Sequence, residues 1–176
     1  MRRFQTIALT TAAAVAATGA AAWALHDRPA ALTDGTGQSC DQVDHGTDAD
    51  AAKAVTGLTS GTRSALDAAR KAATRAGLTL TVNSGYRSAA YQQRVYDCWV
   101  KQTGSAQAAR QHALPPSESA HVAGFAIDVA PPAAATWLEH SKGGYGLCRR
   151  YGNEPWHFEY QASYKADGCP ALLSHP

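Results

Sequence analysis

The stretch Ser119-Ala-His121-Val-Ala-Gly124-Phe-Ala-Ile-Asp128 joins a strand pattern to two side chains that can bind a metal ion. Large apolar residues alternate with small or polar ones over 125–129, which predicts a strand with Asp128 on the face opposite the large side chains. Gly124 lets the chain turn sharply and return His121 toward that face. We therefore expect a sheet whose polar face carries Asp128, with His121 beside it.

A second strand is predicted over 156–160, where aromatic residues alternate with His157 and Glu159. If this strand pairs with 125–129, Asp128 and His157 project from the same face. Three ligands, His121, Asp128 and His157, would leave the fourth position of a tetrahedral zinc ion open for water, which is the arrangement of a catalytic site. Zinc lowers the pKa of bound water from ~15.7 toward ~7, so hydroxide becomes available at neutral pH.

Glu154 precedes His157 by three residues, and Pro155 marks the entry to the strand. Because an odd spacing would place it on the wrong face of a strand, we expect Glu154 to project from the preceding loop and to reach the water. There it would act as general base and then as general acid for the leaving amine. Glu159 is the rival base, but it lies deeper in the strand, so we interpret it as supporting a ligand or lying at the surface.

A third segment, Ser84-Gly-Tyr-Arg87-Ser88, follows an alternating strand pattern over 78–82. Ser88 can cap a helix that ends near Gly104, which places Arg87 at a strand-to-helix junction. Beside a cationic zinc ion, the guanidinium of Arg87 is suited to hold a carboxylate. Each short motif is a weak signal alone, and their conjunction carries the prediction. We assign a surface or core role to the other histidines: His26, His45, His112, His140 and His175.

Helical spacing of apolar residues predicts further helices over 60–76, 105–113 and 133–141. With 176 residues, of which 45% are hydrophobic and 17% charged, the chain fits one domain with a modest core. The predicted helices thus alternate with short predicted strands along the chain.

Residues 1–24 have the features of an export signal: a basic start, an apolar alanine-rich stretch and a small-x-small cleavage site. An uncleaved membrane anchor is the alternative, and either places the domain outside the cytoplasm. The polar residues 25–55 indicate a linker. The functional domain is then expected over 56–176, outside the cytoplasm and membrane-bound only through the possible anchor.

Removal of residues 1–24 takes Arg2 and Arg3 from the 16 Lys plus Arg, which leaves 14 against 14 Asp plus Glu. The net charge then falls from +2 to zero, so no basic surface is expected to bind nucleic acid. We expect a monomer.

Four cysteines lie in the exported part of the chain: Cys40, Cys98, Cys148 and Cys169. An even count in an oxidising compartment predicts two disulfides, and the wide spacing argues against zinc ligation. Of three possible pairings, we favour Cys98 with Cys148, which would join a helix beside Arg87 to the chain entering the last motif. Cys40 with Cys169 would then join the two ends of the domain.

Together these segments resemble the zinc-dependent D-alanyl-D-alanine carboxypeptidase and dipeptidase family of cell-wall peptidases, which includes the VanY-type enzymes. The family pattern S-x-H-x-x-G-x-A-x-D is met over 119–128, E-P-W-H-F over 154–158, and S-G-Y-R-S-x-x-x-Q over 84–92. The likeness spans residues ~56 to ~165 and its motifs are specific in combination.

The resemblance implies one zinc ion on His121, Asp128 and His157, with Glu154 as catalytic base. It implies that Arg87 polarises the scissile carbonyl or holds the substrate carboxylate. Ser119 and Gln92 are implied only as substrate contacts. The resemblance also implies a compact α+β fold of the Hedgehog and DD-peptidase group, a small antiparallel sheet with flanking helices. It implies a secreted or cell-wall-associated protein whose substrate is the D-Ala-D-Ala end of a peptidoglycan stem peptide.

Two alternatives remain open from the sequence. Only seven residues separate Gly146 from Glu154, fewer than we expect of VanY-type members, so the substrate preference stays open. The Trp-His-Phe-Glu run over 156–159 also resembles related phage-type endopeptidases that cut between L-Ala and D-Glu, which makes such an endopeptidase the nearest alternative. Such endopeptidases often place Asp where Glu154 stands, which favours the carboxypeptidase. A non-catalytic cell-wall-binding module is the second alternative, and it would require one of the catalytic residues to be missing.

Overall fold

The structure, a computed structural model, describes Cys40 and residues 55–176. The predicted export segment 1–24 and nearly all of the predicted linker 25–55 lie outside the described residues. Within the part of the chain that is described, no helix combines the length and the apolar character needed to cross a membrane.

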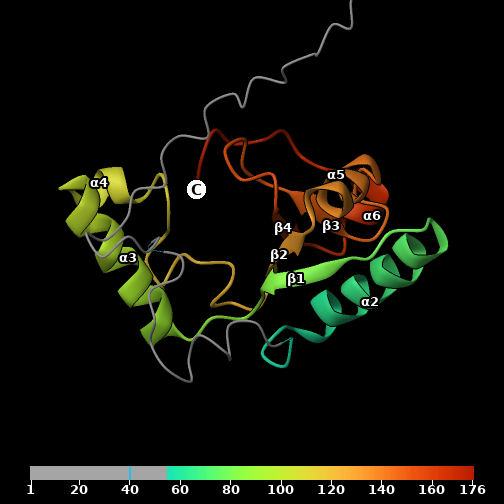
Figure 1. Cartoon of the computed structure of the whole chain (residues 1–176), viewed down its shortest axis with the longest axis horizontal. Helices are drawn as coiled ribbons and strands as arrows, with labels where there is room; N and C mark the ends of the chain where they lie inside the picture. The colour runs from blue at the N-terminus through green and yellow to red at the C-terminus, as the bar shows by residue number, and fades with distance from the viewer. Residues whose placement is uncertain (1–39, 41–54) are drawn as a thin grey trace, which may run out of the picture. The chain divides into compact units, whose positions relative to one another are not determined.

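Four short strands form one antiparallel sheet in the order β1-β2-β4-β3 (Figure 1). Their bounds are β1 (Thr81–Ser84), β2 (Ala126–Ala130), β3 (Leu147–Arg149) and β4 (His157–Tyr160). Every neighbouring pair is antiparallel. This sheet and its helices confirm the predicted α+β class.

The main core lies between the sheet and the helices α2 (Ser60–Arg75) and α5 (Pro132–His140), which contact the sheet and each other. Thr59 caps α2, because its side-chain oxygen accepts from the backbone N–H of Thr62 at 3.2 Å. The apolar face of α2 is alanine-rich apart from Leu66, so the helix can approach the sheet closely. The largest fully buried side chains of this core are Phe158, Leu66, Ile127, Leu138 and Leu147.

A second, smaller core lies under α3 (Ala89–Thr103) and α4 (Ala106–Ala109). Its buried members are Cys40, Tyr91, Val95, Trp99, Ala109 and Ala113. Ser88 caps α3 as predicted, accepting from Tyr91 N at 3.1 Å, and Gly104 ends it in the left-handed conformation. Figure 1 shows α3 and α4 on the side of the sheet away from α2 and α5.

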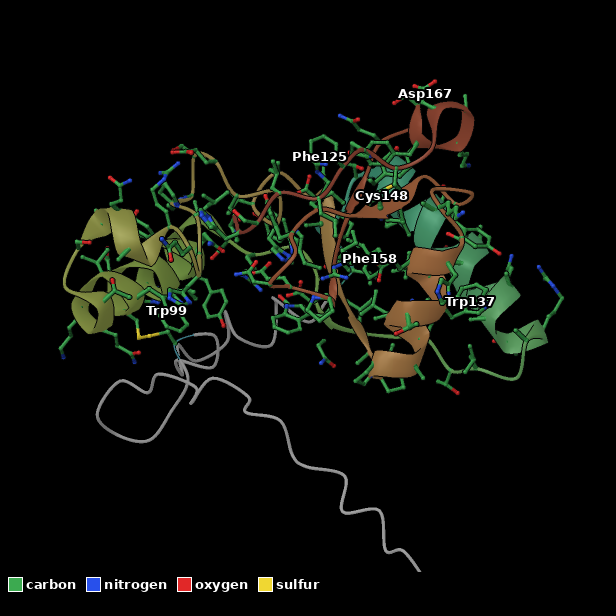
Figure 2. The ribbon with its side chains drawn as sticks, turned by 90° about the horizontal axis from the view of Figure 1, so that it is seen from above. Trp99, Phe125, Trp137, Cys148, Phe158 and Asp167 are labelled. Atoms are coloured by element: carbon green, nitrogen blue, oxygen red, sulfur yellow. A yellow bond between two sulfur atoms is a disulfide. The ribbon has the colours of Figure 1, made fainter. Side chains whose placement is uncertain are left out.

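The predicted disulfide pairing is wrong. The bonds join Cys40 to Cys98 and Cys148 to Cys169, with Cα–Cα distances of 5.6 and 5.4 Å. Cys98 lies on α3 at the small core, whereas Cys148 lies in β3 at the edge of the sheet, and Figure 2 shows Cys148 far from Trp99, the neighbour of Cys98. A disulfide needs Cα atoms within about 7 Å, so each bond forms inside one half of the domain.

Several elements differ from the sequence prediction. The helix predicted over 105–113 is shorter, because regular α-helix covers only Ala106–Ala109 and turns follow it to His112. The first strand begins at Thr81 rather than 78, because β1 pairs with β2 through Thr81 and Val82. The sequence analysis missed β3, which has three residues and no resolvable alternation. It also missed α6 (Tyr164–Asp167), a single turn. Short elements depend on tertiary pairing more than on local pattern.

Candidate metal centre

Three buried side chains bring their ligand atoms together: Nε2 of His121, Oδ1 of Asp128 and Nδ1 of His157. The two nitrogens are 3.2 Å apart, and Oδ1 lies 3.3 Å from His121 and 3.1 Å from His157. In a tetrahedral zinc site with bonds of about 2.0–2.1 Å, neighbouring ligand atoms lie about 3.3–3.4 Å apart. The three residues expected to converge therefore do so, at spacings that suit zinc.

Strand pairing positions two of the three ligands. Asp128 in β2 and His157 in β4 are direct partners in the antiparallel register. Side chains of facing residues lie on one side of a sheet, so both point to the same face, as expected. His157 is the first residue of β4, so the site forms where that strand begins.

A tight turn returns His121 to this face. Gly124 has φ +75°, and its N–H donates to the carbonyl of His121 at 3.2 Å. A Cβ at Gly124 would lie 2.7 Å from the carbonyl oxygen of Gly57, and the Gly124 carbonyl accepts from Thr62 Oγ1 at 2.9 Å. Both the left-handed φ and the close contact require glycine here.

Hydrogen bonds on the outer side of each imidazole set the tautomers. Nδ1 of His121 lies 2.7 Å from the carbonyl oxygen of Gly85, which can only accept, so Nδ1 donates and Nε2 keeps its lone pair. Nε2 of His157 donates to Glu159 at 3.3 Å, which leaves Nδ1 toward the centre. Such outer partners orient histidine ligands in metal sites. Glu159 thus contacts the ring nitrogen of His157 that points away from the centre. This position agrees with our interpretation of Glu159 as a residue that supports a ligand.

Glu159 is held in place by two further contacts. The hydroxyl of Tyr151 donates to its Oε1 at 3.2 Å, and Nε of Arg150 lies 3.6 Å from Oε2. Burial would raise the pKa of Glu159, but the contacts with His157 and Arg150 lower it below its ordinary value. The carboxylate therefore stays ionised as an acceptor for His157.

Arg87 contacts the ligand carboxylate. Its Nη2 donates to Oδ2 of Asp128 at 2.9 Å, its Nε to Ser84 at 2.9 Å and its Nη1 to Gln92 at 3.3 Å. Its backbone N–H donates to the carbonyl of His121 at 3.3 Å. The residue expected to hold substrate is therefore also bound to the metal site.

Glu154 lies in the loop before β4, where the spacing argument placed it. Its Oε2 is 3.8 Å from Nδ1 of His157, the nitrogen that faces the centre, and its side chain is 14% exposed. A carboxylate at this position can reach a water beside the metal and still exchange protons with solvent.

The two residues implied as substrate contacts, Gln92 and Ser119, line the same cleft of about 130 Å³ as the three ligands. Gln92 is fully buried and its amide donates to the carbonyl of Leu114 at 2.7 Å, so its carbonyl end is fixed toward Arg87. Ser119 is buried in the turn before His121.

Sequence reasoning missed other residues of the cleft wall, among them His112, Tyr151, Trp156 and Pro176. Ring stacking between His112 and Trp99, at 4.1 Å between centroids, holds the imidazole at the wall. No metal-ligand spacing marks these residues in the sequence, so only the folded chain could reveal them. Among these residues, Trp156 could have been identified from the sequence, because it lies within the Glu-Pro-Trp-His motif.

The charges at the centre set the protonation states of its three side chains. Burial, with the Arg87 cation, lowers the pKa of His121 to about 4, so this imidazole is neutral at pH 7. Burial opposes charge on His157 too, but hydrogen bonds to Asp128 and Glu159 raise its pKa to about 9. Burial would raise the pKa of Asp128, yet the histidines and Arg87 hold it well below its usual range. The centre thus pairs an anionic carboxylate with a neutral imidazole and a protonated one.

Comparison with known proteins identifies the family. A sequence model of the VanY family, described as D-alanyl-D-alanine carboxypeptidase, matches residues 56–163. The search of curated proteins gave no match.

Solved structures share the fold. A mutant of the vancomycin resistance D,D-pentapeptidase VanY from a VanB-type cassette, in complex with Zn(II), is 24% identical over 62% of this chain and 76% of that chain, with a TM-score of 0.56. VanYB in complex with D-Alanine-D-Alanine is 26% identical over 62% and 77%, also with a TM-score of 0.56. The L,D-carboxypeptidase DacB from Streptococcus pneumoniae is 28% identical over 64% and 71%, with a TM-score of 0.51.

The family match extends over more than half of the 176 residues and includes all three candidate ligands, Arg87 and Glu154. The chain belongs to the VanY family of D-alanyl-D-alanine carboxypeptidases.

Proposed function

We propose that this chain is an exported zinc peptidase that hydrolyses the terminal D-Ala-D-Ala bond of peptidoglycan stem peptides. The observation that carries the proposal is the ligand triangle with sides of 3.1–3.3 Å, with Glu154 3.8 Å from one of its corners. Family membership supports the substrate class, because the family is described by this activity.

His121, Asp128 and His157 would hold one zinc ion. Their donor set, two imidazoles and a carboxylate, is typical of catalytic zinc sites. When bound, zinc polarises the scissile carbonyl and lowers the pKa of a coordinated water. Gly85 and Glu159 keep the two imidazoles in the tautomers that this ligation needs.

Glu154 moves the proton. Its carboxylate takes a proton from the attacking water as the new C–O bond forms at the scissile carbonyl. It then gives that proton to the nitrogen of the leaving D-Ala as the C–N bond breaks. The products are a shortened stem peptide with a new carboxylate and free D-Ala.

Arg87 has two roles in this proposal. Its ion pair with Asp128 orients Oδ1 toward the histidines. A guanidinium has five N–H groups, and three of those of Arg87 donate to partners among the described residues, so two remain for the anionic end or the carbonyl of the substrate. Ser119 is proposed as a direct substrate contact. Gln92 is proposed to touch the substrate as well as to fix Arg87.

A second candidate is an L,D-carboxypeptidase, which releases a terminal D residue joined to an L residue. The similarity to DacB, at 28% identity, favours this possibility. The same site would perform the same chemistry, and only the residue before the scissile bond would differ.

For localisation, we propose export by residues 1–24, as a cleaved signal or an anchor, with 56–176 as the catalytic domain. The substrate supports this assignment, because peptidoglycan lies outside the cytoplasm. Two disulfides among the described cysteines also suit an oxidising compartment.

Product analysis tests the proposal. The oxidised, zinc-loaded protein is incubated with a pentapeptide ending in D-Ala-D-Ala, a tetrapeptide ending in a single D-Ala, and a cross-linked stem, with and without a chelator. Chelator-sensitive release of D-Ala from the pentapeptide is expected, whereas preferential cleavage of the tetrapeptide would establish the L,D activity. An internal cut would establish an endopeptidase, and zinc-loaded protein that released nothing from any substrate would refute the proposal.

A further inference from the structure

Residues 169–176, which we call the C-terminal strap, run beside the loop that carries Glu154. Leu173 exchanges two backbone hydrogen bonds with this loop, donating to the carbonyl of Arg150 at 2.9 Å and accepting from Gly152 at 2.7 Å. The strap is therefore bound along the residues directly before the proposed catalytic base.

One end of the strap is fixed covalently. Cys169 is bonded to Cys148 in β3, and β3 pairs with β4, the strand that begins with His157. The start of the strap is thus tied to the same sheet that positions the metal ligands.

The other end of the strap reaches the cleft. Pro176 lines it together with His112, Glu154 and the three candidate ligands. Pro176 is half-buried, whereas residues 169–175 are all exposed. In Figure 1 the C-terminal end lies between the α3–α4 side of the domain and the sheet. Most of the strap thus runs over the surface, and its residue Pro176 contributes to the wall of the cleft.

The loop beneath the strap is also tied to the other side of the cleft. The side-chain amide of Asn153 donates to the carbonyl of Gln111 at 3.1 Å, just after α4. The next residue, His112, is stacked on Trp99 in the small core. This part of the cleft is therefore held by the sheet side, by the helical side and by the disulfide.

We propose that the C-terminal strap closes one end of the substrate cleft and so determines how many residues of the peptide can lie beyond the scissile bond. This inference rests on the proposed peptidase function. A carboxypeptidase needs room for one residue beyond the bond, whereas an endopeptidase needs a cleft open at both ends. Pro176 suits a steric wall, because its ring is rigid and offers no N–H to a substrate.

A short deletion tests this role. The variant lacks only His175 and Pro176, so Leu173 and the Cys148–Cys169 bond are kept. Cleavage rates are measured on a stem peptide ending in D-Ala-D-Ala and on the same peptide extended by one further residue. Removal of the wall is expected to raise the ratio of extended to unextended cleavage by about tenfold or more, the size of a typical steric discrimination in a pocket. Pro176→Gly should raise it in the same direction.

The matched control is Leu172→Ala. Leu172 belongs to the strap and is 46% exposed, but it does not line the cleft. This variant should keep the parent ratio.

A second readout does not depend on activity. Labelling of His112 by diethyl pyrocarbonate, followed by mass spectrometry, should be faster in the deletion variant than in the parent and unchanged in Leu172→Ala. If the parent releases D-Ala but the deletion leaves the ratio unchanged, the strap inference is overturned and the proposed function stands. If the parent cleaves neither peptide, the proposed function fails. If, in addition, His112 is labelled equally fast in the deletion variant and in the parent, the strap is not a wall of the cleft.

Discussion

Arg87 and Asp128 form an ion pair in which Nη2 lies 2.9 Å from Oδ2, and Oδ1 of the same carboxylate faces the two histidines. Both side chains are largely buried, at 14% and 10% exposure. A buried carboxylate that loses its partner is strongly disfavoured in the ionised form. Arg87, which we expect to bind the substrate, therefore also keeps the candidate ligand Asp128 ionised and oriented toward the histidines.

Arg87→Ala is expected to weaken zinc binding by about 10–100-fold, the usual effect of removing a partner of a metal ligand. The zinc affinity of Arg87→Lys should lie between those of the parent and Arg87→Ala. An ammonium keeps the positive charge but cannot donate to Ser84, Gln92 and Asp128 in the fixed geometry of a guanidinium. Competition with a chelating dye measures the affinity. Arg110→Ala, at an exposed ion pair with Glu118, is the control, and an unchanged affinity in Arg87→Ala would contradict the positioning role.

Glu154→Gln is expected to lower kcat by about 10²–10⁴-fold, the contribution of a positioned general base, while zinc remains bound. The amide keeps the size of the side chain but cannot accept the proton. Steady-state release of D-Ala and zinc content of the purified variant are measured together. Glu118→Gln makes the same chemical change at an exposed position and should retain parent activity. Full activity in Glu154→Gln would direct attention to Glu159 as the base.

Zinc affinity is expected to depend on pH through His157. In the metal-free protein the pKa of His157 is raised from 6.5 to about 9, so its proton stabilises the fold fully below pH 6.5, and this stabilisation is lost as pH rises through 9. That proton must leave Nδ1 before a metal can bind, so the zinc dissociation constant should fall by at least about tenfold per pH unit between pH 6 and 8. Titrations at several pH values measure it, and a flat profile would argue against Nδ1 as a ligand.

The disulfides make a prediction about stability. Cys40–Cys98 closes a separation of 58 residues and Cys148–Cys169 one of 21, so the chain-entropy estimate gives about 4 and about 3 kcal/mol of stabilisation. Replacing both cysteines of a bond by serine should lower the free energy of unfolding, more for Cys40–Cys98 than for Cys148–Cys169. Chemical denaturation measures both values. Peptide mapping without reduction checks the pairing itself, and a Cys98–Cys148 peptide would contradict the structure.

Much of the candidate site could be predicted because its signals are local. Alternation over 125–129 and 156–160 fixes which side chains share a face, so the pairing of Asp128 with His157 follows once the strands meet. The odd spacing of Glu154 excluded it from the strand by the same periodicity. Gly124 stood out because its place between His121 and Asp128 required a turn.

Other features depended on residues far apart in sequence. The sequence assigned Arg87 to the substrate, since nothing local indicates that its guanidinium contacts Asp128, 41 positions away. The disulfide pairing was wrong because Cys40 and Cys98 both lie at the small core, whereas Cys148 lies in β3 of the sheet and is bonded to Cys169. The short strand β3 was invisible because three residues are too few for a period.

The stretch from Ser119 to Asp128 and the motif at Glu154 determined by themselves which side chains could bind a metal and move a proton, because ligand chemistry and strand periodicity are properties of neighbouring residues. Only the tertiary structure decided what surrounds those atoms: Arg87 on Asp128, Glu159 on His157, and Pro176 at the cleft. These contacts join segments whose approach is set by packing of whole elements and by disulfides, which no local pattern encodes.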